Sequence, residues 1–139
     1  MVHKNKIKAI IIDDSAQARK LLRLMLAELA DDVFLIGEAE NASEGFELIT
    51  KLNPDVVFID IEMPGKSGLQ LVEELNQLNT NLNVIFTTAY NEFAIKAFRL
   101  SAVDYLLKPI VESHLIEALN KIRTNKLVSI DHSQLEGLQ

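Results

Sequence analysis

The feature that most constrains the fold is a fivefold alternation between a short apolar run and a longer segment with helical periodicity. The short runs are rich in β-branched residues, which is typical of strands, and the longer segments carry apolar residues at i, i+3 and i+4. The predicted strands are residues 7–12, 33–37, 55–60, 83–87 and 103–106. Five successive βα units predict an α/β fold, with a doubly wound five-stranded parallel sheet and helices on both faces.

Two of the predicted helices begin at recognisable capping residues. Asn41 is followed three residues later by Glu44, and Ser67 is followed at the same spacing by Gln70. This spacing is typical of a capping box, in which the first residue accepts a hydrogen bond from the backbone of the first helical turn. A fourth helix is predicted over about residues 91–100.

The last helix is predicted to carry Leu115, Leu119 and Ile122 on one face. Beyond this helix the chain becomes polar and loses its clear periodicity. We therefore expect one domain over residues 1–124, followed at 125–139 by a linker stub or flexible C-terminal tail.

The composition fits a single cytoplasmic domain. A chain of 139 residues is the length of one ordinary domain, and the absence of cysteine excludes disulfides and thiolate metal sites. The apolar runs are too short to cross a bilayer, and the N-terminus lacks the apolar stretch of a signal peptide. Net charge is −6, with 14 basic residues spread among 20 acidic ones. Without a basic stripe, any contact with DNA is expected from a separate domain.

Charged and hydroxyl side chains stand at the carboxyl ends of four predicted strands. Asp13 and Asp14 follow the first strand, Asp60 ends the third, Thr88 follows the fourth and Lys108 follows the fifth. The carboxyl ends of parallel strands meet at one edge of a sheet, where ligands bind in open α/β folds. We therefore expect these five side chains to converge.

Three neighbouring carboxylates repel one another unless a cation lies between them. Oxygen ligands without histidine or cysteine favour Mg²⁺ or Mn²⁺ over zinc. A carboxylate can also act as a nucleophile and become an acyl phosphate, whose oxygens the Lys108 ammonium and the Thr88 hydroxyl could then bind. The bond between Lys108 and Pro109 is a candidate cis peptide.

Each of these residues alone has an ordinary structural explanation. An acidic pair after a strand often caps the following helix, a threonine often ends a strand, and a single lysine is usually a solvated surface residue. Their joint occurrence at four neighbouring strand ends favours a functional site.

The motifs that carry these residues resemble the receiver domains of two-component response regulators over about residues 6–123. The matching segments are Ile-Ile-Ile-Asp-Asp-Ser at 10–15, Val-Phe-Ile-Asp-Ile-Glu-Met-Pro-Gly at 57–65, Ser-Gly-Leu at 67–69, Phe-Thr-Thr-Ala-Tyr at 86–90 and Asp-Tyr-Leu-Leu-Lys-Pro at 104–109. The resemblance implies a flavodoxin-like sheet of order 2-1-3-4-5. It also implies a phosphoacceptor that catalyses only its own aspartyl phosphorylation and dephosphorylation.

The same resemblance implies a role for each site residue. Asp60 looks like the phosphoacceptor, and Lys108 looks like the phosphate-binding lysine. Asp14 resembles a direct Mg²⁺ ligand and Asp13 a ligand that acts mainly through water. Asp60 is also implied as a metal ligand, and Glu62 as a ligand through its backbone carbonyl. The implied cofactor is therefore Mg²⁺, or Mn²⁺ in its place.

Thr88 and Tyr105 match the hydroxyl and aromatic positions that move when a receiver is activated. The implied partners are a sensor histidine kinase, as the phosphoryl donor, and a second copy of the chain. Phosphorylation is expected to strengthen a homodimer through the fourth helix, fifth strand and fifth helix.

A narrower similarity, over residues 88–98 and 102–110, is to receivers of the LytR/AlgR type. Such receivers are usually fused to a LytTR DNA-binding domain, which this sequence does not contain. The chain is therefore interpreted either as a receiver fragment that ends in its linker or as a stand-alone receiver.

Three alternatives compete with this interpretation. Asp60 and Glu62 form an Asp-x-Glu that is similar to the nucleophile motif of haloacid-dehalogenase-like phosphatases, although that family places Asp-x-Asp on its first strand. A pseudo-receiver would keep the fold but usually lacks one of the acids or the lysine. A nucleotide-binding domain would have a glycine-rich turn after its first strand, where this chain has Asp13 and Asp14.

Overall fold

The computed structural model describes residues 6–78 and 82–137. Strands and helices alternate along the chain, as the apolar pattern predicts. The elements are β1 (Ile7–Ile12), α1 (Ala16–Leu29), β2 (Val33–Ala39), α2 (Ala42–Leu52), β3 (Val56–Asp60), α3 (Gly68–Gln77), β4 (Asn83–Thr88), a 3₁₀ turn η1 (Asn91–Phe93), α4 (Ala94–Arg99), β5 (Asp104–Leu107) and α5 (Glu112–Gly137).

The five strands form one parallel sheet in the order β2-β1-β3-β4-β5, so the expected flavodoxin-like order is confirmed. β3 lies in the centre, and every one of its residues is buried. A strand that is covered on both faces needs apolar side chains in both directions, which is why this segment is a continuous apolar run.

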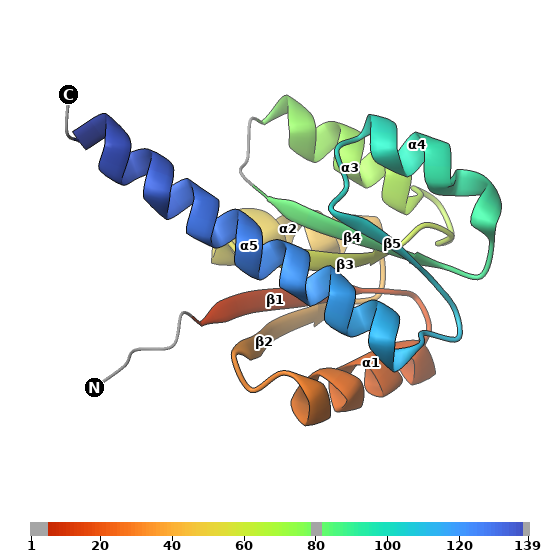
Figure 1. Cartoon of the computed structure of the whole chain (residues 1–139). Coiled ribbons are helices and arrows are strands. Elements are labelled where there is room, and N and C mark those ends of the chain that lie inside the picture. Colours follow the sequence, from red (N-terminus) through yellow and green to blue (C-terminus); the bar gives the residue numbers. More distant parts are fainter. Residues whose placement is uncertain (1–5, 79–81, 138–139) are drawn as a thin grey trace.

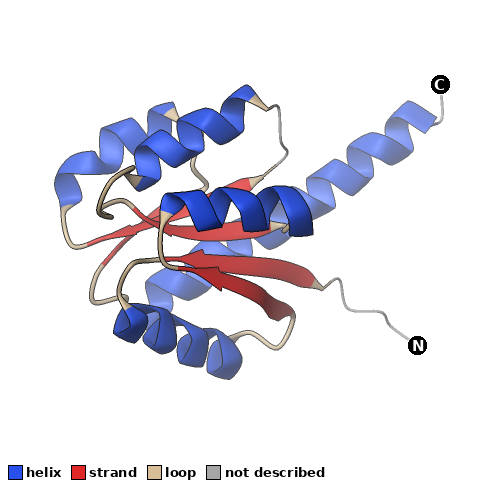
Figure 2. Ribbon diagram, turned by 180° about the vertical axis from the view of Figure 1, so that it is seen from behind, coloured by secondary structure: helices blue, strands red, loops and turns tan. Residues whose placement is uncertain are grey.

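Helices cover both faces of the sheet (Figure 1 and Figure 2). Side chains of α1 and α5 pack on one face in a core that includes Leu22, Leu26 and Leu119. Side chains of α2, α3 and α4 pack on the other face in a core that includes Ile49 and Leu71. The two-faced arrangement leaves the carboxyl ends of the strands open at one edge.

Both expected caps are present. The Asn41 side chain accepts a hydrogen bond from the Glu44 amide at 2.9 Å, and Ser67 and Gln70 form a reciprocal capping box. The fourth helix is shorter than the sequence pattern indicates, because residues 91–93 wind as a 3₁₀ turn before α4 begins. Tyr90 offers this turn no side-chain hydrogen bond, and uncapped helix starts often tighten in this way.

The last helix is longer than the periodicity indicates. The sequence pattern fades after Thr124, yet the backbone of α5 stays helical to Gly137, and its C-terminal part extends past the sheet in Figure 1. Extending a helix costs less than starting one, and residues 112–136 contain no proline or glycine to end it. The division of the chain at residue 124 stays a prediction. No helix in the described part of the chain is long and apolar enough to cross a membrane.

Candidate functional site

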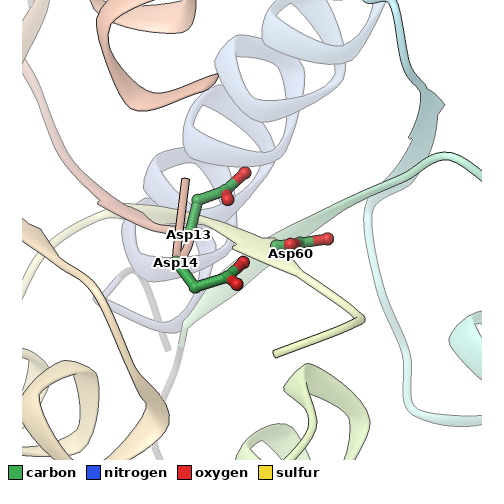
Figure 3. Close-up of side chains that lie close together, drawn as sticks. All are labelled: Asp13, Asp14 and Asp60. Carbon is green, nitrogen blue, oxygen red and sulfur yellow. The ribbon is translucent and has the colours of Figure 1, made fainter. Parts of the chain in front are cut away.

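Three carboxylates meet at the carboxyl edge of the sheet. Asp13 and Asp14 directly follow β1, and Asp60 is the last residue of the neighbouring strand β3 (Figure 3). Each contributes a ligand atom, and these three atoms all lie within 4.8 Å of one another. The convergence expected from the sequence is therefore present for the acids.

Asp13 is buried, and its two carboxylate oxygens and its backbone carbonyl each accept a hydrogen bond. One carboxylate oxygen accepts a hydrogen bond from the Ser15 amide at 2.9 Å, and the other accepts one from the Lys108 ammonium at 2.8 Å. The Asp13 backbone carbonyl accepts a hydrogen bond of 2.6 Å from the Arg19 guanidinium. Asp14, in contrast, is exposed.

Asp60 is only 5% exposed, and its environment disfavours the ionised form of its carboxyl group. Burial and, next, the negative charge of Asp13 raise the pKa of the Asp60 carboxyl from 3.8 to about 7, with a smaller contribution from Asp14. Lys108, at 3.6 Å, and the amide of Glu62, at 3.3 Å, lower this pKa but only partly offset the rise. The acid is therefore poised to lose its proton when a further cation approaches.

The start of α3 packs directly against Asp60. A Cβ atom at Gly68 would lie 2.4 Å from the backbone carbonyl oxygen of Asp60 and 2.8 Å from the side chain of Ile59. The Gly68 amide also donates a hydrogen bond of 2.9 Å to the carbonyl of Ile61. Only a residue without a side chain allows the helix to approach so closely.

The two expected switch residues are joined through the backbone of Tyr90. The hydroxyl oxygen of Thr88, which is fully buried, accepts a hydrogen bond from the Tyr90 amide at 3.2 Å. The hydroxyl group of Tyr105 donates a hydrogen bond to the Tyr90 carbonyl. The Lys108 amide donates to the Thr88 carbonyl at 2.7 Å, and the Lys108–Pro109 peptide is cis.

The donor set fits a small, hard divalent cation. All three side chains offer oxygen, the ligand that Mg²⁺ and Mn²⁺ prefer. Opposite ligands of one octahedral Mg²⁺ lie roughly 4 Å apart, so these carboxylates come close to that spacing and a bound water could bridge the remainder. The Glu62 carbonyl follows Asp60 by two residues and stays a predicted ligand.

Sequence reasoning assigned no role to three features of this site: the Arg19 guanidinium, the absent side chain of Gly68 and the backbone of Tyr90. The glycine directly after the capping residue Ser67 was the available signal for the close approach of α3. The Arg19 and Tyr90 contacts involve backbone carbonyls and a backbone amide, which every residue type shares, so the sequence gives no signal for them.

The fold and the site define a flavodoxin-like α/β domain with three clustered carboxylates at its strand ends, and a comparison with known families gives the same class. The response regulator receiver domain family matches residues 9–120, which is most of the chain. The chain belongs to this family. The expected membership of the receiver family is thereby confirmed, and the phosphatase and nucleotide-binding alternatives are not.

Two named regulatory proteins are similar to the chain in sequence. The chain is 45% identical over 120 residues to the transcriptional regulatory protein BtsR of Escherichia coli (strain K12), covering 86% of this chain and 49% of BtsR. It is 33% identical over 128 residues to the sensory transduction protein LytT of Bacillus anthracis, covering 92% of this chain and 52% of LytT. The chain thus spans about half the length of the curated relatives it matches.

Solved structures show the same fold. The isolated REC domain of RcsB from Salmonella enterica serovar Typhimurium, determined with the phosphomimetic BeF₃⁻, matches with a TM-score of 0.79 and 26% identity, covering 86% of this chain and 90% of that one. The signal receiver domain of the putative response regulator NarL from Mycobacterium tuberculosis matches with a TM-score of 0.78 and 26% identity, covering 86% and 98% of the two chains.

Proposed function

We propose that this receiver domain takes a phosphoryl group on Asp60 and changes its surface in response. The observation that carries the proposal is the grouping of Asp60 with Asp13, Asp14 and the Lys108 ammonium at the open edge of the sheet. This arrangement brings together a carboxylate nucleophile, a site for a divalent cation and a fixed positive charge.

In the proposed reaction an Asp60 oxygen attacks the phosphorus of the donor, and the bond from phosphorus to the donor's leaving atom breaks. Asp13, Asp14 and the Glu62 carbonyl would hold Mg²⁺ or Mn²⁺, which supplies positive charge to the phosphoryl oxygens. Lys108 bridges Asp13 and Asp60, so its ammonium is positioned to pair with a phosphoryl oxygen on Asp60.

The switch follows from the contacts of Thr88. A phosphoryl oxygen on Asp60 would offer the Thr88 hydroxyl a stronger acceptor, and a shift of Thr88 would weaken its contact with the Tyr90 amide. The Tyr105 hydroxyl donates a hydrogen bond to the Tyr90 carbonyl, so a change at Thr88 would reach the Tyr105 ring through Tyr90. We infer two discrete arrangements of Thr88, Tyr90 and Tyr105.

The proposed phosphoryl donor is a sensor histidine kinase. Two large apolar side chains on α1, Leu21 and Leu24, are 53% and 54% exposed on the helix that begins at the acidic site. An exposed apolar pair at this place suits a transient protein contact. We also propose control of transcription through a LytTR-type DNA-binding domain outside this chain, because the matched relatives include a transcriptional regulator of about twice the matched length.

The test is phosphorylation by acetyl phosphate, followed by intact-mass measurement. The chain should gain one phosphoryl group with Mg²⁺, none with a chelator, and none in Asp60→Asn. Asp55→Asn is a matched control, because Asp55 lies just before the opposite end of the same strand. Modification of Asp60→Asn would contradict the assignment, and no modification of the unsubstituted chain would favour the pseudo-receiver. Hydrolysis of p-nitrophenyl phosphate with turnover would contradict the view that the chain acts on itself alone.

A further inference from the structure

Arg19 connects α1 to the peptide unit that carries the acidic pair. Its Nη1 donates a 2.6 Å hydrogen bond to the Asp13 carbonyl, although Arg19 lies six residues further along the chain. Its side chain is 18% exposed, so the contact is largely shielded from water. A charged donor in such surroundings forms a stronger hydrogen bond than a neutral one.

Glu38, on the edge strand β2, holds the other side of the same guanidinium. Its Oε1 lies 3.4 Å from Arg19 Nε, and its Oε2 accepts a 2.6 Å hydrogen bond from Arg23 on the next turn of α1. Arg19 therefore bridges a carboxylate and a carbonyl, whereas the one polar partner of Arg23 among the described residues is the Glu38 carboxylate. The planar fork of an arginine suits such a bridge, and a lysine ammonium cannot reproduce it.

The carbonyl that Arg19 holds belongs to the peptide unit between Asp13 and Asp14. The orientation of this unit sets the direction in which the Asp14 side chain leaves the backbone. In the described part of the chain, the exposed Asp14 carboxylate has no hydrogen-bond or ion-pair partner. Its position therefore depends on the backbone that Arg19 fixes.

We propose that Arg19, oriented by Glu38, is a positioning residue for the divalent-cation site. This inference rests on the proposed function, in which Asp13 and Asp14 help to hold Mg²⁺. For the loss of Arg19, a positioning role and a simple charge effect predict opposite changes in cation affinity. Removing a nearby positive charge would strengthen cation binding, whereas releasing the Asp13–Asp14 peptide unit would weaken it.

The experiment measures Mg²⁺ affinity of the full chain by competition with Mn²⁺, whose free-ion signal is read by electron paramagnetic resonance. Arg19→Met should raise the Kd for Mg²⁺ about tenfold, the size of effect seen when partners that orient metal ligands are removed. Arg19→Lys should recover less than half of this loss on a logarithmic scale, because it restores the charge without the fork. Arg23→Met is the matched control and should stay within about twofold of the unsubstituted chain, because it keeps the Arg19 bridge.

Glu38→Gln leaves Arg19 in place and should also raise the Kd, but it removes a negative charge, so a charge effect alone predicts the same direction. Arg19→Lys keeps the positive charge and separates the two explanations, because a charge effect predicts an unchanged Kd and a positioning role predicts a raised one. Thermal unfolding in EDTA identifies any variant that fails to fold, and Arg19→Lys decides if Arg19→Met does not fold. Unchanged or tighter Mg²⁺ binding by folded Arg19→Met, or an unchanged Kd in Arg19→Lys, would overturn the inference while leaving the proposed function intact. Failure of the unsubstituted chain to bind Mg²⁺ would instead contradict the proposed function.

Discussion

At the scale of single residues, Asp60 is subject to two opposing requirements. A nucleophilic carboxylate must be ionised, but Asp60 is buried beside Asp13, and its pKa is raised to about 7 by burial first and by that neighbouring charge second. Asp60 is therefore only partly ionised near neutrality, and a cation that offsets the repulsion would favour its ionised form. This arrangement would couple ionisation of the proposed nucleophile to occupation of the proposed cation site.

This environment makes the stability of the cation-free protein depend on pH. The pKa of Asp60 is near 3.8 in the unfolded chain and about 7 in the folded one, so only the folded state holds this proton between those values. Stability is lost as the pH rises through this window, and the full penalty applies above pH 7. Asp60→Asn removes the penalty and should melt a few °C above the unsubstituted chain at pH 8 in EDTA, with a much smaller difference at pH 5.

Thermal unfolding monitored by circular dichroism measures both differences. Excess Mg²⁺ at pH 8 should reduce the advantage of Asp60→Asn, because the cation stabilises the carboxylate and not the amide. Equal melting differences at pH 5 and pH 8 would contradict the raised pKa.

The acidic residues of the site could be predicted from sequence because strand ends in a parallel sheet converge whatever the details of packing. Asp13, Asp14 and Asp60 needed only the assignment of two strands to be placed together. The bridge formed by Arg19 could not be predicted in this way. It depends on a side-chain rotamer and on a backbone carbonyl, and both are set only when α1 packs beside β2.

At the scale of elements, the site depends on the close approach of α3 to β3 at Gly68. Replacing Gly68 with alanine would put a methyl group 2.4 Å from the Asp60 carbonyl oxygen, so helix or strand must move. Overpacking of this kind costs about 1–3 kcal/mol, and here it would also displace Asp60, the proposed nucleophile. Gly68→Ala should lower the free energy of unfolding by that amount and slow phosphorylation by acetyl phosphate.

Urea denaturation and intact-mass kinetics measure these two effects. Gly37→Ala is the matched control, because a Cβ atom there would meet its nearest neighbour at an ordinary 3.4 Å. A Gly68→Ala protein as stable and as reactive as Gly37→Ala would show that the approach of α3 is not needed.

The loop between β4 and α4 is held at Tyr90 by groups from both β4 and β5. Tyr105→Phe removes the donor to the Tyr90 carbonyl and should cost about 0.5–1.5 kcal/mol of unfolding free energy in the unphosphorylated protein. Tyr90→Phe is the control, because the acceptor is a backbone carbonyl that this change keeps. Equal stability of the two variants in urea denaturation would contradict a role for the hydrogen bond.

The elements themselves were predicted unequally well. The strands were predicted to within two residues at each end, because β-branched runs and a buried central strand leave a strong pattern. The 3₁₀ turn before α4 and the length of α5 were missed. Both depend on small local differences in hydrogen bonding that apolar periodicity does not record.

At the scale of the whole molecule, the acidic site lies at the carboxyl ends of the strands, whereas α4, β5 and α5 form the surface at the β5 edge of the sheet. The proposed link between them runs through the hydrogen bonds that join Thr88 to Tyr90 and Tyr90 to Tyr105 on β5. On that surface Lys121 of α5 pairs with Asp104 of β5 at 3.0 Å, which ties the strand to the helix. A displacement of Tyr105 would therefore change the positions of both β5 and α5.

The last prediction is that phosphorylation strengthens a homodimer through this surface. Exposed groups of both signs gather on it, which suits a weak, regulated contact better than a permanent apolar one. These groups are Lys96, Arg99, Glu112, Glu117 and Lys121. Beryllofluoride with Mg²⁺ should lower the dimer dissociation constant by at least about fivefold, the lower end of typical coupling between two sites.

Sedimentation equilibrium with and without beryllofluoride measures this constant, and three variants locate its cause. Thr88→Ala should still accept phosphate on Asp60 but lose most of the change in dimer affinity, because the hydroxyl that responds to the phosphoryl group is gone. Arg99→Ala should weaken the dimer itself, since Arg99 lies exposed on α4. Glu28→Ala, exposed on α1, which is not part of this surface, should leave it unchanged. A dimer constant that does not respond to beryllofluoride would contradict the prediction, and a full response in Thr88→Ala would place the coupling on a different route.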